Sequence, residues 1–126
     1  MKINFQGTNL ELTAETLDYC REKLSGLRKF LAEEESVFME VELGKTTRHH
    51  RQGEVFRAEV NLHSAVGRFR SEAVAEDLYA AIDEVKDELL TEIKRYRKRQ
   101  GTLLRRSGRL VKDFLRGVYH YKWRKH

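Results

Sequence analysis

The sequence predicts an α+β fold in which two helices cover one face of a four-stranded, mostly antiparallel sheet. Four short segments alternate apolar and polar residues, which is the period of a half-buried strand. Two longer segments repeat apolar residues at a spacing of three and four, which is the period of an amphipathic helix. In chain order the elements run β-α-β-β-β-α, and this order predicts a two-layer sandwich followed by a basic C-terminal tail helix.

The first strand and the first helix are expected within residues 1–31. Ile3 and Phe5 stand at alternate positions, which suits a short strand with one buried face. Thr13 is a typical helix N-cap, and the helix that follows is expected to run to about Leu31. The buried face of this helix is expected to consist of Leu17, Cys20, Leu24, Leu27 and Leu31.

Two strands with regular alternation and a shorter third strand follow the first helix. Their inward-facing residues are expected to be Val37, Met39, Val41 and Leu43 in one strand, and Phe56, Ala58, Val60 and Leu62 in the next. The third strand, residues 67–73, alternates outward arginines with inward Phe69 and Ser71. The polar connection over residues 46–53 is long enough to project from the sheet.

The longest predicted element is a helix over residues 77–100, which begins acidic and ends basic. Its core-facing residues are expected to be Leu78, Ile82, Val85, Leu89, Ile93 and Tyr96. Asp77 is a favourable charge at the helix N-terminus. Gly101 is expected to break the helix, so the sequence predicts a folded domain over residues 1–100 and a basic amphipathic tail over residues 101–126.

The charges are segregated along the chain. Residues 1–89 contain 12 Lys and Arg against 18 Asp and Glu, whereas residues 90–126 contain 13 against 2, and the net charge is +5. Such segregation indicates a surface for a polyanion. Aromatic residues alternate with cations near the C-terminus, where they either stack on unpaired bases of RNA or pack back on the domain; they are Tyr119, Tyr121 and Trp123.

A helical wheel divides the basic end of the long helix into two flanks. One flank is expected to face phosphate and carries Lys86, Lys94, Arg97 and, at its edge, Lys98. Arg95 and Arg99 lie on the other flank, where Glu88 and Glu92 partly neutralise them. Further candidate RNA-binding residues lie in the first helix, the polar connection and the tail: Lys23, Arg28, Lys29, Arg48, His49, Arg51, Arg105, Arg106, Arg109 and Lys112.

Several classes of site are disfavoured by the residue pattern. His49, His50 and His63 do not suit a metal, because adjacent histidines point apart and no thiol or carboxylate lies at a ligand spacing. Asp77 and Asp83 fall on different helix faces, and no nucleophile-and-base pattern or phosphate loop is visible, so neither catalysis nor a cofactor is expected. Cys20, the single cysteine, fits a buried apolar position better than a reactive thiol. A polar N-terminus and short apolar runs predict a cytoplasmic protein.

Three segments carry a resemblance to a known family. They are the opening INFQGTNLELT, the strand GEVFRAEVNL after the loop TTRHHRQ, and EDLYAAID at the start of the long helix. Over roughly residues 1–99 the sequence resembles the ribosome hibernation promoting factor family, also known as ribosome-associated inhibitor or sigma-factor modulation proteins. It resembles the short form, which has no separate C-terminal domain for pairing ribosomes.

The resemblance implies a β-α-β-β-β-α fold and binding in the decoding region of the small ribosomal subunit, where messenger and transfer RNA would be blocked. It implies rRNA contacts for Lys23, Arg95 and Arg97. At other positions where relatives often carry cations, this chain has Gly26, Glu88 and Thr91. The expected partner is the small subunit with its rRNA, and the free protein is expected to be monomeric, without stable membrane association.

Two other functions remain open on the sequence alone. A general structured-RNA-binding protein or RNA chaperone would present the same cations to phosphate. A peripheral adaptor would instead lay its basic amphipathic tail on an anionic membrane.

Overall fold

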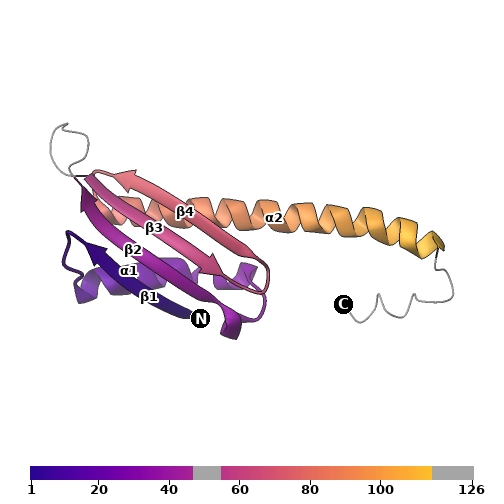
Figure 1. The fold of residues 1–126 in the computed structure, drawn as a ribbon, viewed down its shortest axis with the longest axis horizontal. Helices are drawn as coiled ribbons and strands as arrows, with labels where there is room; N and C mark the ends of the chain where they lie inside the picture. The colour runs from indigo at the N-terminus through magenta and orange to yellow at the C-terminus, as the bar shows by residue number, and fades with distance from the viewer. Residues whose placement is uncertain (47–54, 115–126) are drawn as a thin grey trace. The chain divides into compact units, whose positions relative to one another are not determined.

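The fold is a four-stranded sheet with two helices on one face. The structure, a computed structural model, describes the backbone of residues 1–46 and 55–114, and the side chains of that range apart from residues 34 and 102–114. The elements are β1 (Lys2–Thr8), α1 (Ala14–Ser25), η1 (Arg28–Phe30), η2 (Glu34–Ser36), β2 (Phe38–Thr46), β3 (Val55–His63), β4 (Arg68–Ala75) and α2 (Leu78–Phe114), as Figure 1 shows.

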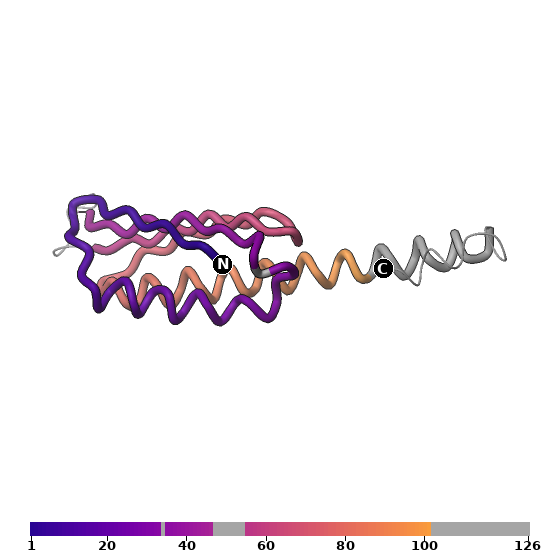
Figure 2. Tube along the Cα trace, turned by 90° about the horizontal axis from the view of Figure 1, so that it is seen from below, coloured from indigo at the N-terminus to yellow at the C-terminus, as the bar shows by residue number. Residues whose placement is uncertain are grey.

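The strands lie in the order β1-β2-β3-β4, so sequence neighbours are also spatial neighbours. β1 pairs with β2 in parallel, whereas β2 with β3 and β3 with β4 are antiparallel. α1 makes the crossover that a parallel pair requires. Seen from the side in Figure 2, α1 and the first part of α2 form a second layer on one face of the sheet. The predicted α+β two-layer sandwich is confirmed.

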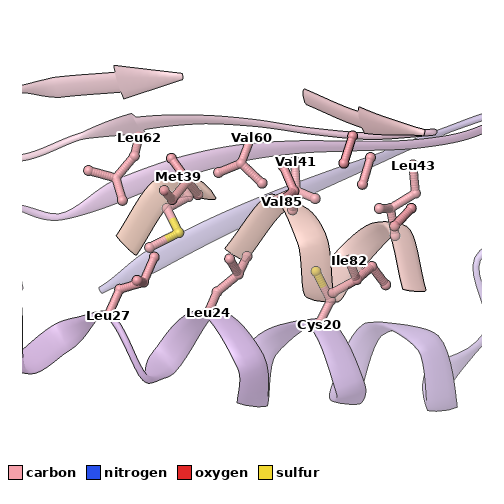
Figure 3. Close-up of a cluster of buried hydrophobic side chains, with 14 of the residues drawn as sticks. Cys20, Leu24, Leu27, Met39, Val41, Leu43, Val60, Leu62, Ile82 and Val85 are labelled. Carbon is pink, nitrogen blue, oxygen red and sulfur yellow. The ribbon is translucent and has the colours of Figure 1, made fainter. Parts of the chain in front are cut away.

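The core lies between the sheet and the two helices. Figure 3 shows Cys20, Leu24 and Leu27 pointing from the first helical segment toward the sheet. The fully buried residues that meet there include Met39, Val41, Leu43, Val60, Leu62, Ile82 and Val85. The strand residues among them are those whose period-two alternation predicted an inward face. Each buried aliphatic side chain stabilises the fold by about 1.5–3 kcal/mol relative to an exposed one.

The first helix starts where the sequence predicts and ends earlier. Thr13 caps it, because its side-chain oxygen accepts a hydrogen bond from the Thr16 N–H at 3.2 Å. The prediction that α1 runs to Leu31 is wrong, since it ends at Ser25 with Gly26 as its C-cap and a 3₁₀ turn, η1, follows. Glycine is a poor helix former. The tighter turn still leaves Leu31 buried, which explains why the apolar pattern continues past the helix end.

The long helix α2 begins as predicted and does not stop at Gly101. Asp77 accepts a hydrogen bond from the Ala80 N–H at 3.1 Å and so caps the helix. The prediction that Gly101 breaks the helix is wrong, because α2 continues to Phe114. One glycine costs a helix about 1 kcal/mol relative to alanine, and good helix formers such as Lys98 and Gln100 flank it. The chain divides into two units, Met1–Lys94 and Arg95–His126, and the sandwich belongs to the first.

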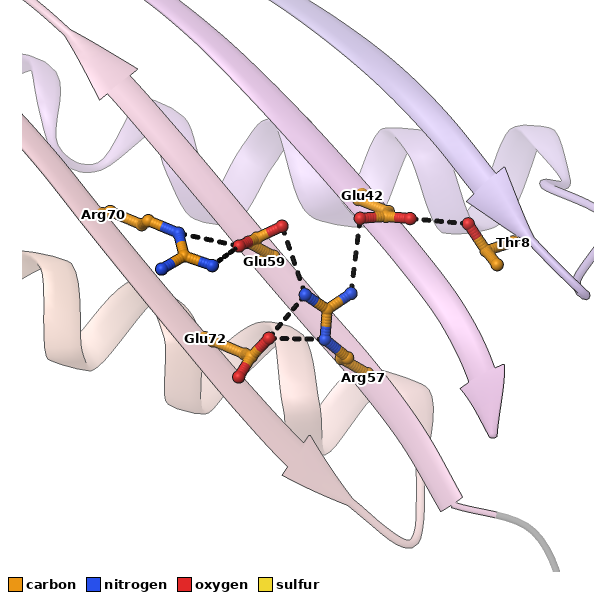
Figure 4. A network of polar contacts seen from close by, with 6 residues as sticks. All are labelled: Thr8, Glu42, Arg57, Glu59, Arg70 and Glu72. Carbon is orange, nitrogen blue, oxygen red and sulfur yellow. Dashed lines mark hydrogen bonds and ion pairs between the residues drawn. The ribbon is translucent and has the colours of Figure 1, made fainter. Parts of the chain in front are cut away.

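The face of the sheet away from the helices carries a network of ionic and hydrogen-bonding side chains (Figure 4). Arg57 lies at its centre, 3.3 Å from Glu42 and 3.2 Å from Glu59. Arg70 also contacts Glu59, and Thr8 donates to Glu42 at 2.6 Å. The Thr8 hydroxyl, and next the Arg57 guanidinium, hold the pKa of Glu42 below its ordinary value. Opposite charges on neighbouring strands therefore support the strand register on this face.

Candidate nucleic-acid interface

The outer surface of the helix layer brings together cations from two distant parts of the chain. α1 and α2 run in the same direction, because contacts proceed in chain order from Tyr19 with Asp83 to Phe30 with Lys94. The strip where α1 and η1 meet α2 is called the helix seam below. Its lysines are Lys23, Lys29, Lys86 and Lys94, and its one carboxylate with a described ion pair to them is that of Asp83.

The Lys86 side chain lies beside Gly26 at the seam. A Cβ atom added at Gly26 would lie 3.7 Å from the Cε atom and 3.9 Å from the Nζ atom of Lys86. The Lys86 ammonium group therefore lies beside the C-terminus of α1, where the helix dipole favours a positive charge. A cation from α2 thus occupies the surface next to Gly26, the position at which the resemblance implies a lysine in relatives.

Lys29 and Lys94 share one aromatic ring. Their Nζ atoms lie 5.5 Å and 5.2 Å, respectively, from the centre of the Phe30 ring. Phe30 is half-buried and packs against the core, so one side of its ring is held by the core. Both distances are within the range of a cation–π interaction. Phe30 therefore holds a cation of η1 and a cation of α2 on the same part of the surface.

Lys23 differs from the other seam lysines because it forms an ion pair. Its Nζ atom lies 3.5 Å from Oδ1 of Asp83 and 5.6 Å from the centre of the Tyr19 ring. The Tyr19 hydroxyl donates to the same Asp83 oxygen at 2.6 Å. That hydrogen bond, followed by desolvation, raises the pKa of Tyr19 to about 12. Tyr79 contacts the Tyr19 ring edge-on, with 4.6 Å between ring centres.

Three acidic residues of α2 lie on the side of the helix that faces β4, away from the seam. Ser71 of β4 donates a hydrogen bond to the Glu88 carboxylate. Asp87, Glu88 and Glu92 line a groove between α2 and β4. The wheel-based prediction that Lys86 and Lys94 are separated from Glu88 and Glu92 is thus confirmed. The seam is therefore the basic side of the helix layer.

The remaining candidate residues are distributed more widely. Arg28 is exposed and donates from Nε to the Ser25 carbonyl at 3.3 Å. Arg95, Arg97 and Lys98 are exposed on α2 within the second unit. Two further sets cannot be placed: Arg48, His49 and Arg51 lie outside the described residues, and Arg105, Arg106, Arg109 and Lys112 belong to the part of α2 whose side chains are not described.

Sequence reasoning missed the roles of Phe30, Asp83 and Gly26 at the seam. Each role depends on a contact between α1 or η1 and α2, and the two helices are separated by about 50 residues of sequence. Helical periodicity indicates which residues share a face of one helix, but it does not indicate the register between two helices. No signal in the sequence alone would have paired Asp83 with Lys23.

Other kinds of site receive no support in the described part of the chain. No group of three His, Cys, Asp or Glu side chains there is placed to hold a metal ion. His63 lies 3.5 Å from Glu40 and stacks on Phe38. Cys20 is buried as predicted, and desolvation raises the pKa of its thiol to about 12. No helix within the described ranges is long and apolar enough to cross a membrane.

The family model described as sigma 54 modulation protein / S30EA ribosomal protein matches residues 3–101. The chain belongs to this family. A relative from Klebsiella oxytoca, named ribosome hibernation promoting factor, is 29% identical over 97 residues, which cover 77% of this chain and 94% of that protein. A relative of the same name from Pseudomonas putida is 28% identical over 104 residues and is likewise covered to 94%, with 82% of this chain aligned.

Two solved structures have the same fold as this chain. The N-terminal domain of Protein Y from Thermus thermophilus is 35% identical, with a TM-score of 0.61, 75% of this chain covered and 94% of that domain covered. A ribosomal subunit interface protein from Coxiella burnetii has a TM-score of 0.63 with 13% identity, and the match covers 78% of this chain and 99% of that protein. At that identity the second likeness supports the fold alone.

Proposed function

We propose that this protein is a non-catalytic ribosome hibernation factor that binds the decoding region of the small subunit through the helix seam. Bound there, it inhibits translation because messenger and transfer RNA cannot occupy the same channel. The observation that carries the proposal is the seam itself, where four lysines from α1, η1 and α2 gather on one strip. Family membership supports the ribosome as the partner. In this proposal the free protein is monomeric and cytoplasmic.

The seam suits phosphate more than base edges. The four seam cations named above are lysines, which act as compact point charges and lack the planar fork with which arginine reads a guanine edge. Lysines on a rigid helix pair bind an RNA backbone by its shape and charge. If the seam and the basic residues beyond it neutralise about five to eight phosphates, the affinity falls steeply with salt concentration.

The test is co-sedimentation with small ribosomal subunits, with and without messenger RNA and initiator transfer RNA. Occlusion predicts mutual exclusion, so prebound messenger and transfer RNA should reduce the amount of protein that sediments. A factor that binds equally well to empty and occupied subunits would contradict the occlusion mechanism. Binding that does not change between low and moderate salt would contradict the electrostatic account.

The role of the seam is tested with charge variants of equal size. Replacing Lys86 and Lys94 by Gln should weaken binding about tenfold or more, since two phosphate contacts are lost. The matched control replaces Lys2 and Lys45 by Gln, because these lysines belong to the sheet, in β1 and β2, and not to α1, η1 or α2. Equal losses in both double variants would show that net charge, and not the seam, determines affinity.

A general structured-RNA binder is the second candidate, and the four lysines of the seam are the observation that favours it. Lysines without a base-reading group would grip the phosphates of any folded RNA. Competition separates the two functions: an RNA hairpin at equal phosphate concentration displaces a general binder from small subunits. It should leave a subunit-specific factor bound.

A further inference from the structure

We propose that Asp83 limits the affinity of the helix seam for RNA. Its carboxylate forms an ion pair with the Lys23 ammonium group, and an RNA phosphate must displace this carboxylate before Lys23 contributes to binding. This inference rests on the function proposed above and concerns the strength of binding at the same surface. It assigns different roles to the seam lysines, with Lys86 and Lys94 open to phosphate and Lys23 engaged in advance.

The Asp83 carboxylate is held in place by α1. Oδ1 accepts the Tyr19 hydroxyl at 2.6 Å and lies 3.5 Å from Nζ of Lys23. Tyr19 and Lys23 are one helical turn apart, so both reach the same oxygen from one side. Tyr79 contacts the Tyr19 ring edge-on and limits its movement. The carboxylate is therefore anchored by a hydrogen bond that does not depend on Lys23.

The pair is accessible to a competing anion. The side chains of Lys23 and Asp83 are 42% and 43% exposed. Exposed ion pairs are weak because water screens them, so a phosphate can replace the carboxylate. After that exchange Asp83 remains beside the phosphate as an uncompensated negative charge. Both the exchange and the remaining repulsion reduce the affinity that Lys23 would otherwise provide.

The other seam lysines differ from Lys23 in this respect. Within the described part of the chain, no carboxylate oxygen lies within 4.0 Å of the ammonium groups of Lys29, Lys86 or Lys94. Lys86 lies against Gly26, and the other two lie over the ring of Phe30. A phosphate approaching these lysines displaces no carboxylate of the described residues. The four lysines are thus unequal, although all lie on one strip.

The decisive variant is Asp83→Asn. An asparagine keeps an oxygen that accepts the Tyr19 hydroxyl, so the shape of the contact remains and only the charge is lost. The matched control is Glu84→Gln, which makes the same charge change one residue later, about 100° around α2. Small-subunit affinity is measured over a range of salt concentrations for both variants and for the wild type.

The expected result is about two- to fivefold tighter binding of Asp83→Asn at low salt, in line with the strength of an exposed charge pair. The plot of log affinity against log salt should become steeper by just under one unit, because the Lys23–phosphate contact then releases a counterion without freeing a carboxylate that takes one up. Glu84→Gln should remain close to the wild type. A purely structural role for Asp83 would change the thermal midpoint and leave this salt slope unaltered.

Lys23→Gln provides a second measurement that does not need the Asp83 variant to fold. Alone it should weaken binding less than Lys86→Gln, and in the Asp83→Asn background its effect should grow. Equal effects of Lys23→Gln in both backgrounds would overturn the inference, as would unchanged binding by Asp83→Asn. If the wild type itself fails to bind small subunits, the proposed function falls and this inference with it.

Discussion

The Nζ atom of Lys94 lies 5.2 Å from the centre of the Phe30 ring, so a cation of α2 is held over the 3₁₀ turn that follows α1. Lys29 approaches the same ring from η1. The ring is half-buried against the core. The position of two cations of the helix seam therefore depends on one aromatic side chain that has no charge of its own.

Replacing Phe30 by Leu tests that dependence. Leucine keeps the apolar contact with the core but removes the ring face, so Lys29 and Lys94 lose a partner worth about 0.5–1 kcal/mol. We expect the affinity for small subunits to fall about two- to fivefold, in proportion to that energy. Phe56→Leu is the control, because Phe56 belongs to β3 and its ring lies 6.0 Å from Lys45 of β2, so no seam lysine is involved in this contact. Equal losses in both variants would contradict a specific role for Phe30.

The uninterrupted course of α2 predicts that Gly101→Ala stabilises the helix. A Cβ atom added at Gly101 would meet no other atom of the described residues within 4 Å, and alanine is favoured over glycine by about 0.5–1 kcal/mol in a helix. Far-ultraviolet circular dichroism should show more helix at elevated temperature. Gly7→Ala is the contrasting variant, since its Cβ atom would lie 2.6 Å from the Leu10 carbonyl oxygen and should destabilise the fold.

The buried thiol of Cys20 predicts a loss of stability in alkali. Its pKa is raised to about 12, whereas the thiol of the unfolded chain ionises near about 8.5. Its contribution to stability is therefore complete below the unfolded pKa and is lost as pH rises from there toward the folded pKa. The slope is about 1.4 kcal/mol per pH unit. The difference in unfolding free energy between wild type and Cys20→Ala should follow this slope.

A chemical measurement checks the same point. Iodoacetamide should label Cys20 slowly in the folded protein and rapidly after denaturation, because only the thiolate reacts and burial suppresses it. Rapid labelling under native conditions would contradict the assignment of Cys20 to the core.

The network on the face of the sheet away from the helices predicts that the stability of the fold decreases in acid. The folded pKa of Glu42 is depressed, chiefly by the Thr8 hydroxyl, so Glu42 contributes stability above its unfolded pKa of about 4.3 and loses it as pH falls. Thr8→Val removes the hydroxyl and keeps the shape. The pKa of Glu42, followed by nuclear magnetic resonance, should rise toward its ordinary value. Thr91→Val is the control, since Thr91 bonds a carbonyl of α2.

Most of the fold was predictable, because the periodicity of apolar residues and the N-caps of helices are features of the local sequence. The alternation around Met39 and Val60 predicted two strands, and Thr13 and Asp77 marked helix starts that the structure confirms. Helix ends were less predictable. Gly26 ends α1 whereas Gly101 does not end α2, although both interrupt an apolar helical pattern.

The difference between the two glycines comes from tertiary packing. Beyond Gly26, Leu27 and Leu31 are drawn into the core by a 3₁₀ turn, and Lys86 of α2 lies against the glycine. At Gly101 no described atom approaches the Cβ position, so local propensity decides. The site shows the same division. Which lysines share a flank of α2 follows from the period, but the pairing of Lys23 with Asp83 needs the packing of two helices.

The parallel pairing of β1 with β2 has a consequence for folding during synthesis. Lys2 pairs with Phe38 across the whole of α1, whereas β2, β3 and β4 are neighbours in an antiparallel meander. During synthesis β1 leaves the ribosome before β2, its neighbour in the described sheet, and pairs with it only after β2 has followed. The ordering of the first strand therefore waits on a distant segment, since loop closure precedes the gain from non-local contacts. The N-terminal strand is completed by the chain that comes after it.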